Sequence, residues 1–401
     1  MSNAELVPVL ILGGHANALS IARSLGQKGI VVSISEEENC LAFKSKYCKK
    51  SYPVPTGQTA MDFWYDLLLI NKCDELSGCA IMVGSDLAVE FMSAHKTALS
   101  KNYILDDFDP DIQLAMLNKQ KTLELAELCG CAIPAFWNIN TIKDVEQVIG
   151  DVTYPVMIKP INSHLFQKQF IGKKYLLANS RSELLNHIKQ VLDKNLQLMV
   201  TEMIQGADDM SSSYHTYINE SGEHLFHYTH KISRRFPKNS GIGTLHTTTY
   251  DPNVAEMGRR FFNGINYRGM GHIEFKYDVR DKQLKVIECN PRFSAALAIS
   301  TKSGLDMSYL IYCHMVGRPL AKNRTYRTNV KSWMVLQDIF ALKQLLALGE
   351  ISYLKWLKSL FGSGLVFPYF RLSDPMPFFA IIYRYSNSIF IKIKKRWIKR
   401  V

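Results

Sequence analysis

The sequence predicts a mixed fold in which an α/β region is followed by an α+β region and then by a basic, helix-rich segment. Three observations predict it: short apolar strands alternate with helical patterns in the first hundred residues, long alternating strands fill 198–288, and basic and aromatic residues gather after 331. At about 100–200 residues per domain, 401 residues allow two to four domains. We expect domain bounds of 1–115, 116–330 and 331–401.

The N-terminal region begins with a strand over 7–12, and a helix over 16–25 and a second strand over 30–34 follow it. A later strand over 79–83 precedes a helix over 87–99. This β-α-β succession predicts a parallel sheet with ligand-facing loops at the carboxyl ends of its strands.

The first turn of this region contains Gly13, Gly14 and His15. It is not a G-x-G-x-x-G motif, but it gives the following helix an N-terminus whose N–H groups suit a carboxylate or a phosphate. We therefore take these three residues as candidate substrate-binding residues. The alternative is a tight turn that simply requires small residues.

A hairpin over 272–293 is the most informative stretch. Over 272–278 polar and apolar residues alternate, so Glu274 and Lys276 share one face. If Asp278 pairs with Leu284, counting along the strands places Glu274 directly opposite Glu288, where like charges destabilise the pair.

Asn290 lies on the same face as Glu288. Two carboxylates and an amide oxygen are hard ligands, and bound Mg²⁺ would turn the repulsion into coordination. Glu274, Glu288 and Asn290 are therefore the predicted metal ligands. The alternative is a solvated strand face with Lys276 as the counter-charge.

The residues EFK and VIECNPRF of this hairpin resemble the metal-binding end of ATP-grasp enzymes, which join a carboxylate to an amine, a thiol or a similar nucleophile. The resemblance covers about residues 5–330. The opening GGHANALSIARSLG and the late DPMP segment bring it nearest to predicted carboxylate–amine ligases of the D-aspartate ligase-like group. It implies a Rossmann-like pre-ATP-grasp domain and an ATP-grasp domain of two α+β subdomains, before a helical basic extension.

The resemblance also implies roles for individual residues. Lys119 and Lys159 correspond to the nucleotide lysines, and a triphosphate does need such point cations. Arg292 corresponds to an arginine that faces the reacting carboxyl. The residues of the adenine hinge and its surroundings are Glu202, Met203, Ile204 and Asp209. The alternatives are exposed lysines and a sheet-edge glutamate.

Two further features concern the phosphate groups. Lys231 and Arg234 in HKISRRFP are predicted phosphate or substrate contacts with a catalytic role, and the alternative is a basic surface strand. Many ATP-grasp enzymes have a glycine-rich phosphate loop after the second lysine, whereas this chain has NSHLF at 162–166.

Together these features predict an ATP-dependent ligase that uses ATP and Mg²⁺, or Mn²⁺ in its place. A small-molecule carboxylate becomes an acyl phosphate and is joined to an amine. In one form of this hypothesis, an amino acid is added to a cell-surface polysaccharide or peptide precursor. The alternatives are a non-catalytic ATP-binding regulator and a membrane-docked scaffold with the same fold.

The formal net charge of +12 is uneven, because 331–401 carries +9 of it. This distribution argues against nucleic acid as a partner. The basic amphipathic end, 386–401, is a candidate for peripheral contact with the inner face of a membrane, and the alternative is packing on the enzyme's own surface. Eight cysteines without a C-x-x-C pair fit a cytoplasmic location. A homodimer is a further candidate arrangement.

Overall fold

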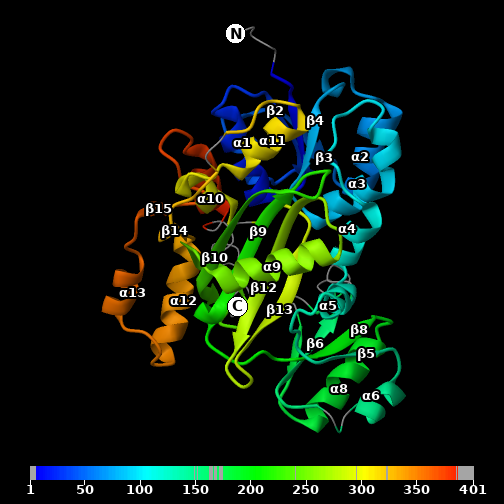
Figure 1. Ribbon diagram of the computed structural model, residues 1–401, viewed down its shortest axis with the longest axis vertical. Helices are drawn as coiled ribbons and strands as arrows, with labels where there is room; N and C mark the ends of the chain where they lie inside the picture. The colour runs from blue at the N-terminus through cyan, green and yellow to red at the C-terminus, as the bar shows by residue number, and fades with distance from the viewer. Residues whose placement is uncertain are drawn as a thin grey trace, which may run out of the picture. The chain divides into compact units, whose positions relative to one another are not determined.

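The computed structural model describes residues 6–384 and 386, except 149, 151, 162–165, 167–168, 171–174, 240, 295 and 322–323 (Figure 1). The chain divides into two compact units. Unit 1 comprises Met1–Pro110, Leu245–Thr248 and Arg292–Val401, and unit 2 comprises Asp111–Thr244 and Thr249–Pro291. The predicted domain bounds of 1–115, 116–330 and 331–401 stay a prediction.

Unit 1 begins with a four-stranded sheet of order β3-β2-β1-β4, and each of its neighbouring pairs is parallel. This confirms the predicted parallel sheet, although β3 and α2 were not predicted. Trp64 and Phe91 lie in the apolar core beside the sheet, with their rings 5.6 Å apart. The elements are β1 (Val9–Leu12), α1 (His15–Gly26), β2 (Val32–Glu37), β3 (Cys48–Val54), α2 (Ala60–Tyr65), β4 (Ala80–Val83) and α3 (Asp86–Leu99).

The C-terminal part of the described chain also belongs to unit 1. Besides its helices it holds two short strands that pair in parallel. Its elements are α10 (Leu297–Ser303), α11 (Met307–Met315), β14 (Val330–Trp333), α12 (Val335–Ala347), α13 (Tyr353–Ser359) and β15 (Gly364–Val366).

A buried ion pair joins this C-terminal part to α1. The Arg23 guanidinium donates to Asp374 at 2.8 Å and also to the carbonyls of Pro368 and Tyr369. The Ser45 hydroxyl donates to the same carboxylate at 2.7 Å. The chain up to Asp374 therefore packs on the N-terminal part of its own unit. The predicted amphipathic segment 386–401 lies outside the described residues, apart from residue 386.

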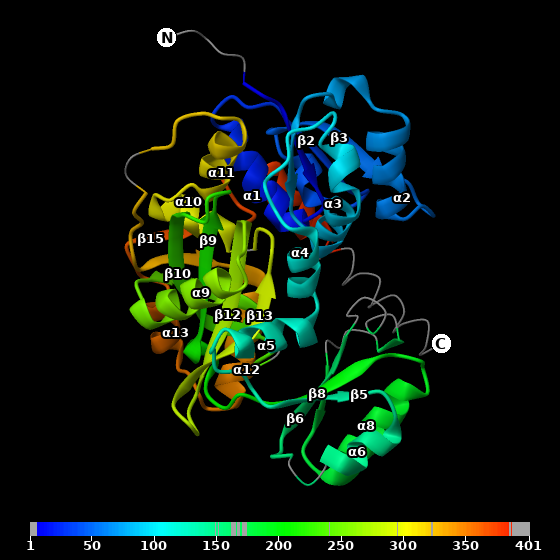
Figure 2. The same cartoon turned by 45° about the vertical axis from the view of Figure 1, so that its right-hand side comes forward.

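Unit 2 contains a small antiparallel sheet of order β5-β8-β6-β7 with α6 and α8 on one face (Figure 2). Val156, Ile158 and Val200 face these helices in a separate apolar core. The elements of this part are α4 (Pro110–Leu117), α5 (Lys119–Leu128), β5 (Phe136–Ile139), α6 (Ile142–Val148), β6 (Val156–Pro160), β7 (Leu176–Ala178), α8 (Arg181–Leu192) and β8 (Leu198–Glu202).

The long strands of unit 2 belong to a seven-stranded sheet of order β13-β12-β9-β10-β11-β14-β15, and the division between the units falls within β11. Helix α9 covers one face of β9, β10 and β12 (Figure 1). The elements here are β9 (Ser211–Ile218), β10 (His224–Phe236), β11 (Ile242–Thr249), α9 (Pro252–Gly264), β12 (Gly269–Asp278) and β13 (Gln283–Asn290).

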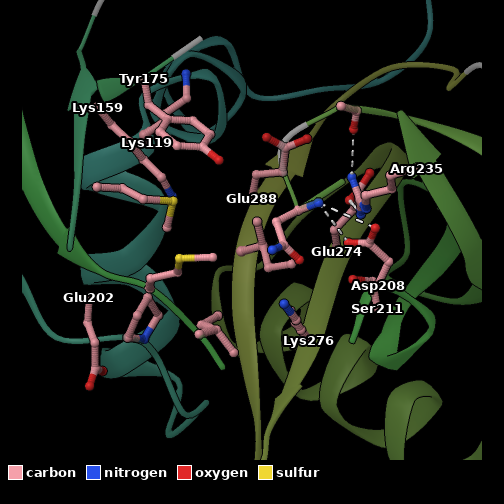
Figure 3. A pocket seen from close by; sticks show the side chains of 17 residues that line it. Lys119, Lys159, Tyr175, Glu202, Asp208, Ser211, Arg235, Glu274, Lys276 and Glu288 are labelled. Carbon is pink, nitrogen blue, oxygen red and sulfur yellow. Dashed lines mark hydrogen bonds and ion pairs between the residues drawn. The ribbon is translucent and has the colours of Figure 1, made fainter. Parts of the chain in front are cut away.

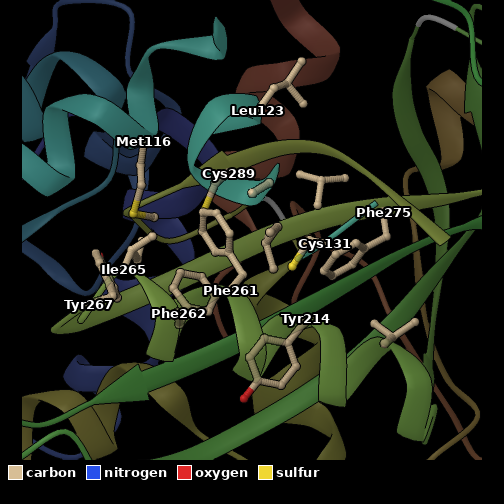
Figure 4. Packing of buried hydrophobic residues seen from close by; sticks show 14 of the residues in the cluster. Met116, Leu123, Cys131, Tyr214, Phe261, Phe262, Ile265, Tyr267, Phe275 and Cys289 are labelled. Carbon is tan, nitrogen blue, oxygen red and sulfur yellow. The ribbon is translucent and has the colours of Figure 1, made fainter. Parts of the chain in front are cut away.

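The core under α9 fixes which face of β12 and β13 is polar (Figure 4). Ile273 and Phe275 pack with Phe261 and Phe262 of the helix, so Glu274 and Lys276 face the other way. Cys289 is buried in the same core, where burial raises the pKa of its thiol well above the ordinary value. Cys289 is therefore a small buried residue of this core.

The β12–β13 register confirms that Glu274 pairs with Glu288. The expected pairing of Asp278 with Leu284 was wrong, because Asp278 pairs with Gln283. A bulge explains this one-residue difference between the two registers. Phe275 pairs with Val286 and Glu274 pairs with Glu288, so Ile287 is an extra residue on β13.

We predict that Asp374→Ala lowers the free energy of unfolding by about 3–5 kcal/mol, because it leaves the Arg23 guanidinium buried without its counter-charge. Urea unfolding followed by circular dichroism measures this loss. The control is Glu256→Ala, which breaks the exposed Arg260–Glu256 pair and costs under about 1 kcal/mol. Equal losses in both variants would contradict the proposed role of the buried pair.

The pH dependence of this pair follows from the same contacts. Burial raises the pKa of Asp374, but hydrogen bonds from Arg23, Lys46 and Ser45 outweigh it, and the net pKa is lowered. The pair's contribution to stability is therefore present above about pH 4 and is lost as the pH falls through the lowered pKa.

Candidate active site

A cavity of about 180 Å³ lies within unit 2 (Figure 3). Its walls come from the polar face of β12 and β13, from the small sheet, and from the start of α5. The described residues that line it are Lys119, Pro134, Met157, Lys159, Tyr175, Glu202, Met203, Ile204, Asp208, Ser211, Arg235, Asn239, Gly241, Glu274, Lys276, Ile287 and Glu288.

Two lysines reach the cavity from different elements. Lys119 is the first residue of α5, directly after Asn118, whose side chain accepts hydrogen bonds from the backbone N–H groups of Gln120 and Lys121. Lys159 extends from β6, and Figure 3 shows both lysines on the same side as Tyr175. Burial lowers the pKa of Lys159 to about 8, with Glu288 acting against this shift and Lys119 adding to it.

Glu274 and Glu288 face the cavity from neighbouring strands. Arg235 donates to Glu274 at 3.2 Å, and the Asn290 amide donates to Glu288 at 3.4 Å. The Ile287 bulge matters here, because it lets two consecutive residues, Ile287 and Glu288, line the same cavity.

This donor set fits Mg²⁺. Carboxylate and amide oxygens are its preferred protein ligands, and it commonly binds one or two carboxylates together with substrate phosphates. Among the described residues, no group of three or more His, Cys, Asp or Glu side chains could hold a metal ion. Glu274 and Glu288 alone leave coordination positions of Mg²⁺ open, and substrate phosphates commonly fill such positions.

The far wall of the cavity carries charges of both signs. Burial raises the pKa of Asp208, while Arg235 and Lys276 act against that shift. Burial also lowers the pKa of Lys276, and Asp208 opposes that change. Figure 3 shows Asp208, Arg235 and Lys276 around Glu274. This end of the cavity therefore offers carboxylates to a cation and basic side chains to an anion.

The hinge strand β8 ends at Glu202, and Met203 and Ile204 continue along the cavity. Arg280, in the β12–β13 turn, contacts Glu202 at 2.7 Å and donates to the Met203 carbonyl at 3.4 Å. Asp278 is fully buried and accepts from Arg280 at 2.6 Å and from Lys285 at 3.0 Å. The hairpin turn thus holds the hinge through a charged network.

The predicted residues Lys231, Arg234 and Asp209 of unit 2 are not among the described residues that line the main cavity. Lys231 is in register with Ser212 of β9, and Ser212 is in register with Phe275 of β12. Lys231 therefore lies on the same face of the sheet as Phe275, the face covered by α9, whereas Glu274 lies on the other face. There it lines a second hollow together with Asp209, whereas Asp208 lines the main cavity. Arg234 is buried and is not among the described residues that line the main cavity.

Other predicted residues belong to unit 1. The Arg292 guanidinium pairs with Asp86. Gly13 and Gly14 have φ of 71° and 98°, and a Cβ at Gly14 would lie 2.5 Å from the Gly84 carbonyl oxygen. The tight-turn alternative therefore accounts for both glycines.

His15 follows this turn and is exposed. Its backbone N–H contacts the carboxylate of Glu36 at 3.4 Å, so an anionic side chain already faces the start of α1. The predicted replacement for the glycine-rich loop, 162–166, lies outside the described residues except for Phe166.

Arg235, Asp208 and Arg280 are the site residues that the sequence analysis missed. Arg235 stands in the HKISRRFP segment, but the β9–β10 pairing ends at Ile232, so strand alternation could not select it over its neighbour. Asp208 opens a 3₁₀ turn (Asp208–Met210), where a choice between adjacent aspartates needs the backbone direction. Arg280 could have been found from its place in the turn that follows Asp278.

Comparisons with known proteins bear on this site. No protein-family model matches the chain. D-aspartate ligase of Enterococcus faecium is 24% identical over 356 residues, which are 83% of this chain and 83% of that protein.

Two solved structures share the fold. The biotin carboxylase domain dimer of Hydrogenobacter thermophilus 2-oxoglutarate carboxylase, in complex with MgADP and bicarbonate, has a TM-score of 0.64 at 14% identity, over 82% of this chain and 74% of that one. L-amino acid ligase of Bacillus licheniformis has a TM-score of 0.58 at 17% identity, over 82% and 79%.

The predicted resemblance to ATP-grasp carboxylate–amine ligases is confirmed. The expected enzyme class and the expected cofactors, ATP and Mg²⁺, agree with these relatives, one of which holds MgADP. The two-subdomain organisation and the roles of individual residues stay predictions. In the part of the chain that the structure describes, no helix is both long and apolar enough to cross a membrane.

We predict that ATP binds more weakly as the pH rises above about 8, because the Lys159 ammonium loses its proton there. The affinity falls by up to about tenfold per pH unit above this pKa, and calorimetric titration between pH 6.5 and 9.5 measures it. The arginine of Lys159→Arg stays charged, so this variant should lose the fall in ATP affinity above pH 8. The surface change Lys189→Arg should keep that fall. If the ATP affinity of Lys159→Arg still falls above pH 8, Lys159 is not the group whose titration weakens ATP binding.

We also predict that Arg280→Ala raises KM for ATP about tenfold with little change in kcat, because the hinge loses a charged hydrogen-bond donor far from the phosphates. Arg280→Lys restores part of the affinity. The surface change Arg260→Ala serves as the matched control. A fall in kcat at constant KM would contradict a positioning role at the hinge.

Proposed function

We propose that the cavity of unit 2 binds ATP with Mg²⁺, and that the chain uses it to activate a small-molecule carboxylate and join it to an amine. One observation supports this most: two lysines and two opposed glutamates line a single cavity that also contains the hinge segment and several apolar side chains. Lysines bind phosphates, and the glutamates supply the metal ligands that such a nucleotide brings with it.

At the phosphate end, Lys119 and Lys159 contact the phosphate oxygens in this proposal. Glu274, Glu288 and Asn290 hold Mg²⁺, which when bound neutralises charge on the β- and γ-phosphates. Arg235 contacts Glu274, so its guanidinium lies beside the residues that would hold the metal and the phosphates. We propose Arg235 for the cationic role first given to Lys231.

At the other end, the hinge binds the nucleoside. Glu202 accepts from the ribose hydroxyls, and the backbone of Met203 and Ile204 contacts the base edge. Apolar side chains of Pro134, Met157 and Ile287 line the same cavity and suit a flat base. The ion pair with Arg280 holds the Glu202 carboxylate in position.

The reaction has two steps in this account. A substrate carboxylate oxygen attacks the γ-phosphorus and ADP leaves, which forms an acyl phosphate. The amine then attacks the acyl carbon and phosphate leaves, so that an amide is formed. The lysines and Arg235 stabilise the charge that develops on the transferring phosphoryl group.

The similarity to D-aspartate ligase and L-amino acid ligase supports an amino acid as one substrate. An acceptor on a cell-surface polysaccharide or peptide precursor is our finer proposal. The roles of Arg292 with the carboxylate and of Gly13, Gly14 and His15 with a substrate anion stay predictions. A homodimer, a cytoplasmic location and membrane contact through 386–401 also stay predictions.

The test is phosphate release measured with ATP, Mg²⁺ and pairwise mixtures of amino acids, D-aspartate included, with candidate acceptors. We expect release that requires both partners. Glu288→Gln should lower it by about 100-fold or more, since one metal ligand is lost. The exposed change Glu256→Gln is the control.

Two outcomes would contradict the proposal. Full activity of Glu288→Gln would mean that the metal assignment is wrong. Tight ATP binding without turnover for any pair in the panel would favour the alternative of a nucleotide-binding regulator.

A further inference from the structure

Helix α13 (Tyr353–Ser359) carries an apolar ridge on its outer side. Tyr353, Leu354 and Leu357 stand at positions i, i+1 and i+4, so they share one face of the helix. Their exposed fractions are 67%, 70% and 48%. Backbone hydrogen bonds continue the helical turn to Phe361, which is 72% exposed. Four large apolar side chains thus lie close together in solvent.

The opposite side of α13 is anchored to its own unit, which fixes where the ridge faces. The Trp356 indole donates to Asp338 of α12 at 2.8 Å, and its ring meets Trp333 edge to face at 5.9 Å. The Ser352 side chain caps the start of the helix. Because Trp356 holds the inner side, the ridge cannot turn inward without breaking these contacts.

The helix that carries the ridge is positively charged. Lys355 and Lys358 belong to it, and it has no acidic residue, although Glu350 precedes it. Exposed leucine and aromatic side chains beside lysines are the composition of surfaces that lie in the interface of an anionic membrane.

We propose that the ridge of α13, comprising Tyr353, Leu354, Leu357 and Phe361, docks on an anionic lipid surface. The ridge enters the boundary between headgroups and acyl chains, and Lys355 and Lys358 contact lipid phosphates. A second copy of this chain is a poorer occupant, because two chains of net charge +12 repel one another whereas anionic lipid attracts them. The proposal goes beyond the ligase function and does not depend on it.

The test is co-sedimentation of the full chain with vesicles of phosphatidylcholine and phosphatidylglycerol at 3:1. The variant Leu354→Ser with Phe361→Ser should bind about tenfold more weakly or worse, since binding scales with the apolar area inserted. The control is Leu128→Ser with Ile142→Ser, which removes two exposed apolar side chains from α5 and α6 and should bind as the unchanged protein does. Thermal unfolding verifies that each variant is folded.

A second pair of variants tests the charge. Lys355→Ala with Lys358→Ala should weaken binding about fivefold per lysine on these vesicles, but not on pure phosphatidylcholine. Lys143→Ala with Lys189→Ala, on α6 and α8, is the matched control. Unchanged vesicle binding by the ridge variant would overturn the proposal. A dimer that the ridge variant converts to a monomer in sedimentation velocity, without vesicle binding, would also overturn it, because the occupant would then be a second copy.

Discussion

The opposition of Glu274 and Glu288 across the β12–β13 pair is the constraint on which the site depends. Two carboxylates at directly opposed positions of an antiparallel ladder repel each other. The remaining parts of the cavity compensate this repulsion: Arg235 contacts Glu274, and Glu288 acts on the buried Lys159 ammonium. Without these cations the pair would destabilise the hairpin, and with Mg²⁺ and phosphate it becomes a binding site.

Among the described residues that line the cavity, acidic and basic side chains are equal in number. Lys119, Lys159, Arg235 and Lys276 stand against Glu202, Asp208, Glu274 and Glu288. A balanced site binds neither a bare phosphate nor a bare metal ion strongly. In the proposed function, MgATP would suit such a site, since it brings a cation to the carboxylates and an anion to the lysines and Arg235.

Much of the fold and site could be predicted from sequence, because strand alternation is a local property. Alternation alone placed Glu274 and Lys276 on one face of the strand. The Ile287 bulge could not be foreseen, because one extra residue on a strand shifts the pairing without leaving a mark in the alternating sequence pattern. The sequence analysis missed Arg235 and Asp208 for a similar reason, because both residues lie where regular strand pairing ends.

Long-range packing was also out of reach. Arg23 and Asp374 are 351 positions apart, and nothing near either residue indicates their contact. The strong positive charge after residue 331 predicted only an attached basic segment. The structure shows that the described part of this segment belongs to unit 1, and that its Trp356 anchors a helix with an exposed apolar face.

The most direct measurement is Mn²⁺ binding followed by electron paramagnetic resonance, in the presence and absence of ADP. The account predicts that the protein takes up Mn²⁺ tightly only with ADP, and that Glu274→Gln with Glu288→Gln abolishes this uptake. Tight Mn²⁺ uptake that needs no nucleotide, or that survives the loss of both carboxylates, would contradict the central role of the opposed glutamates.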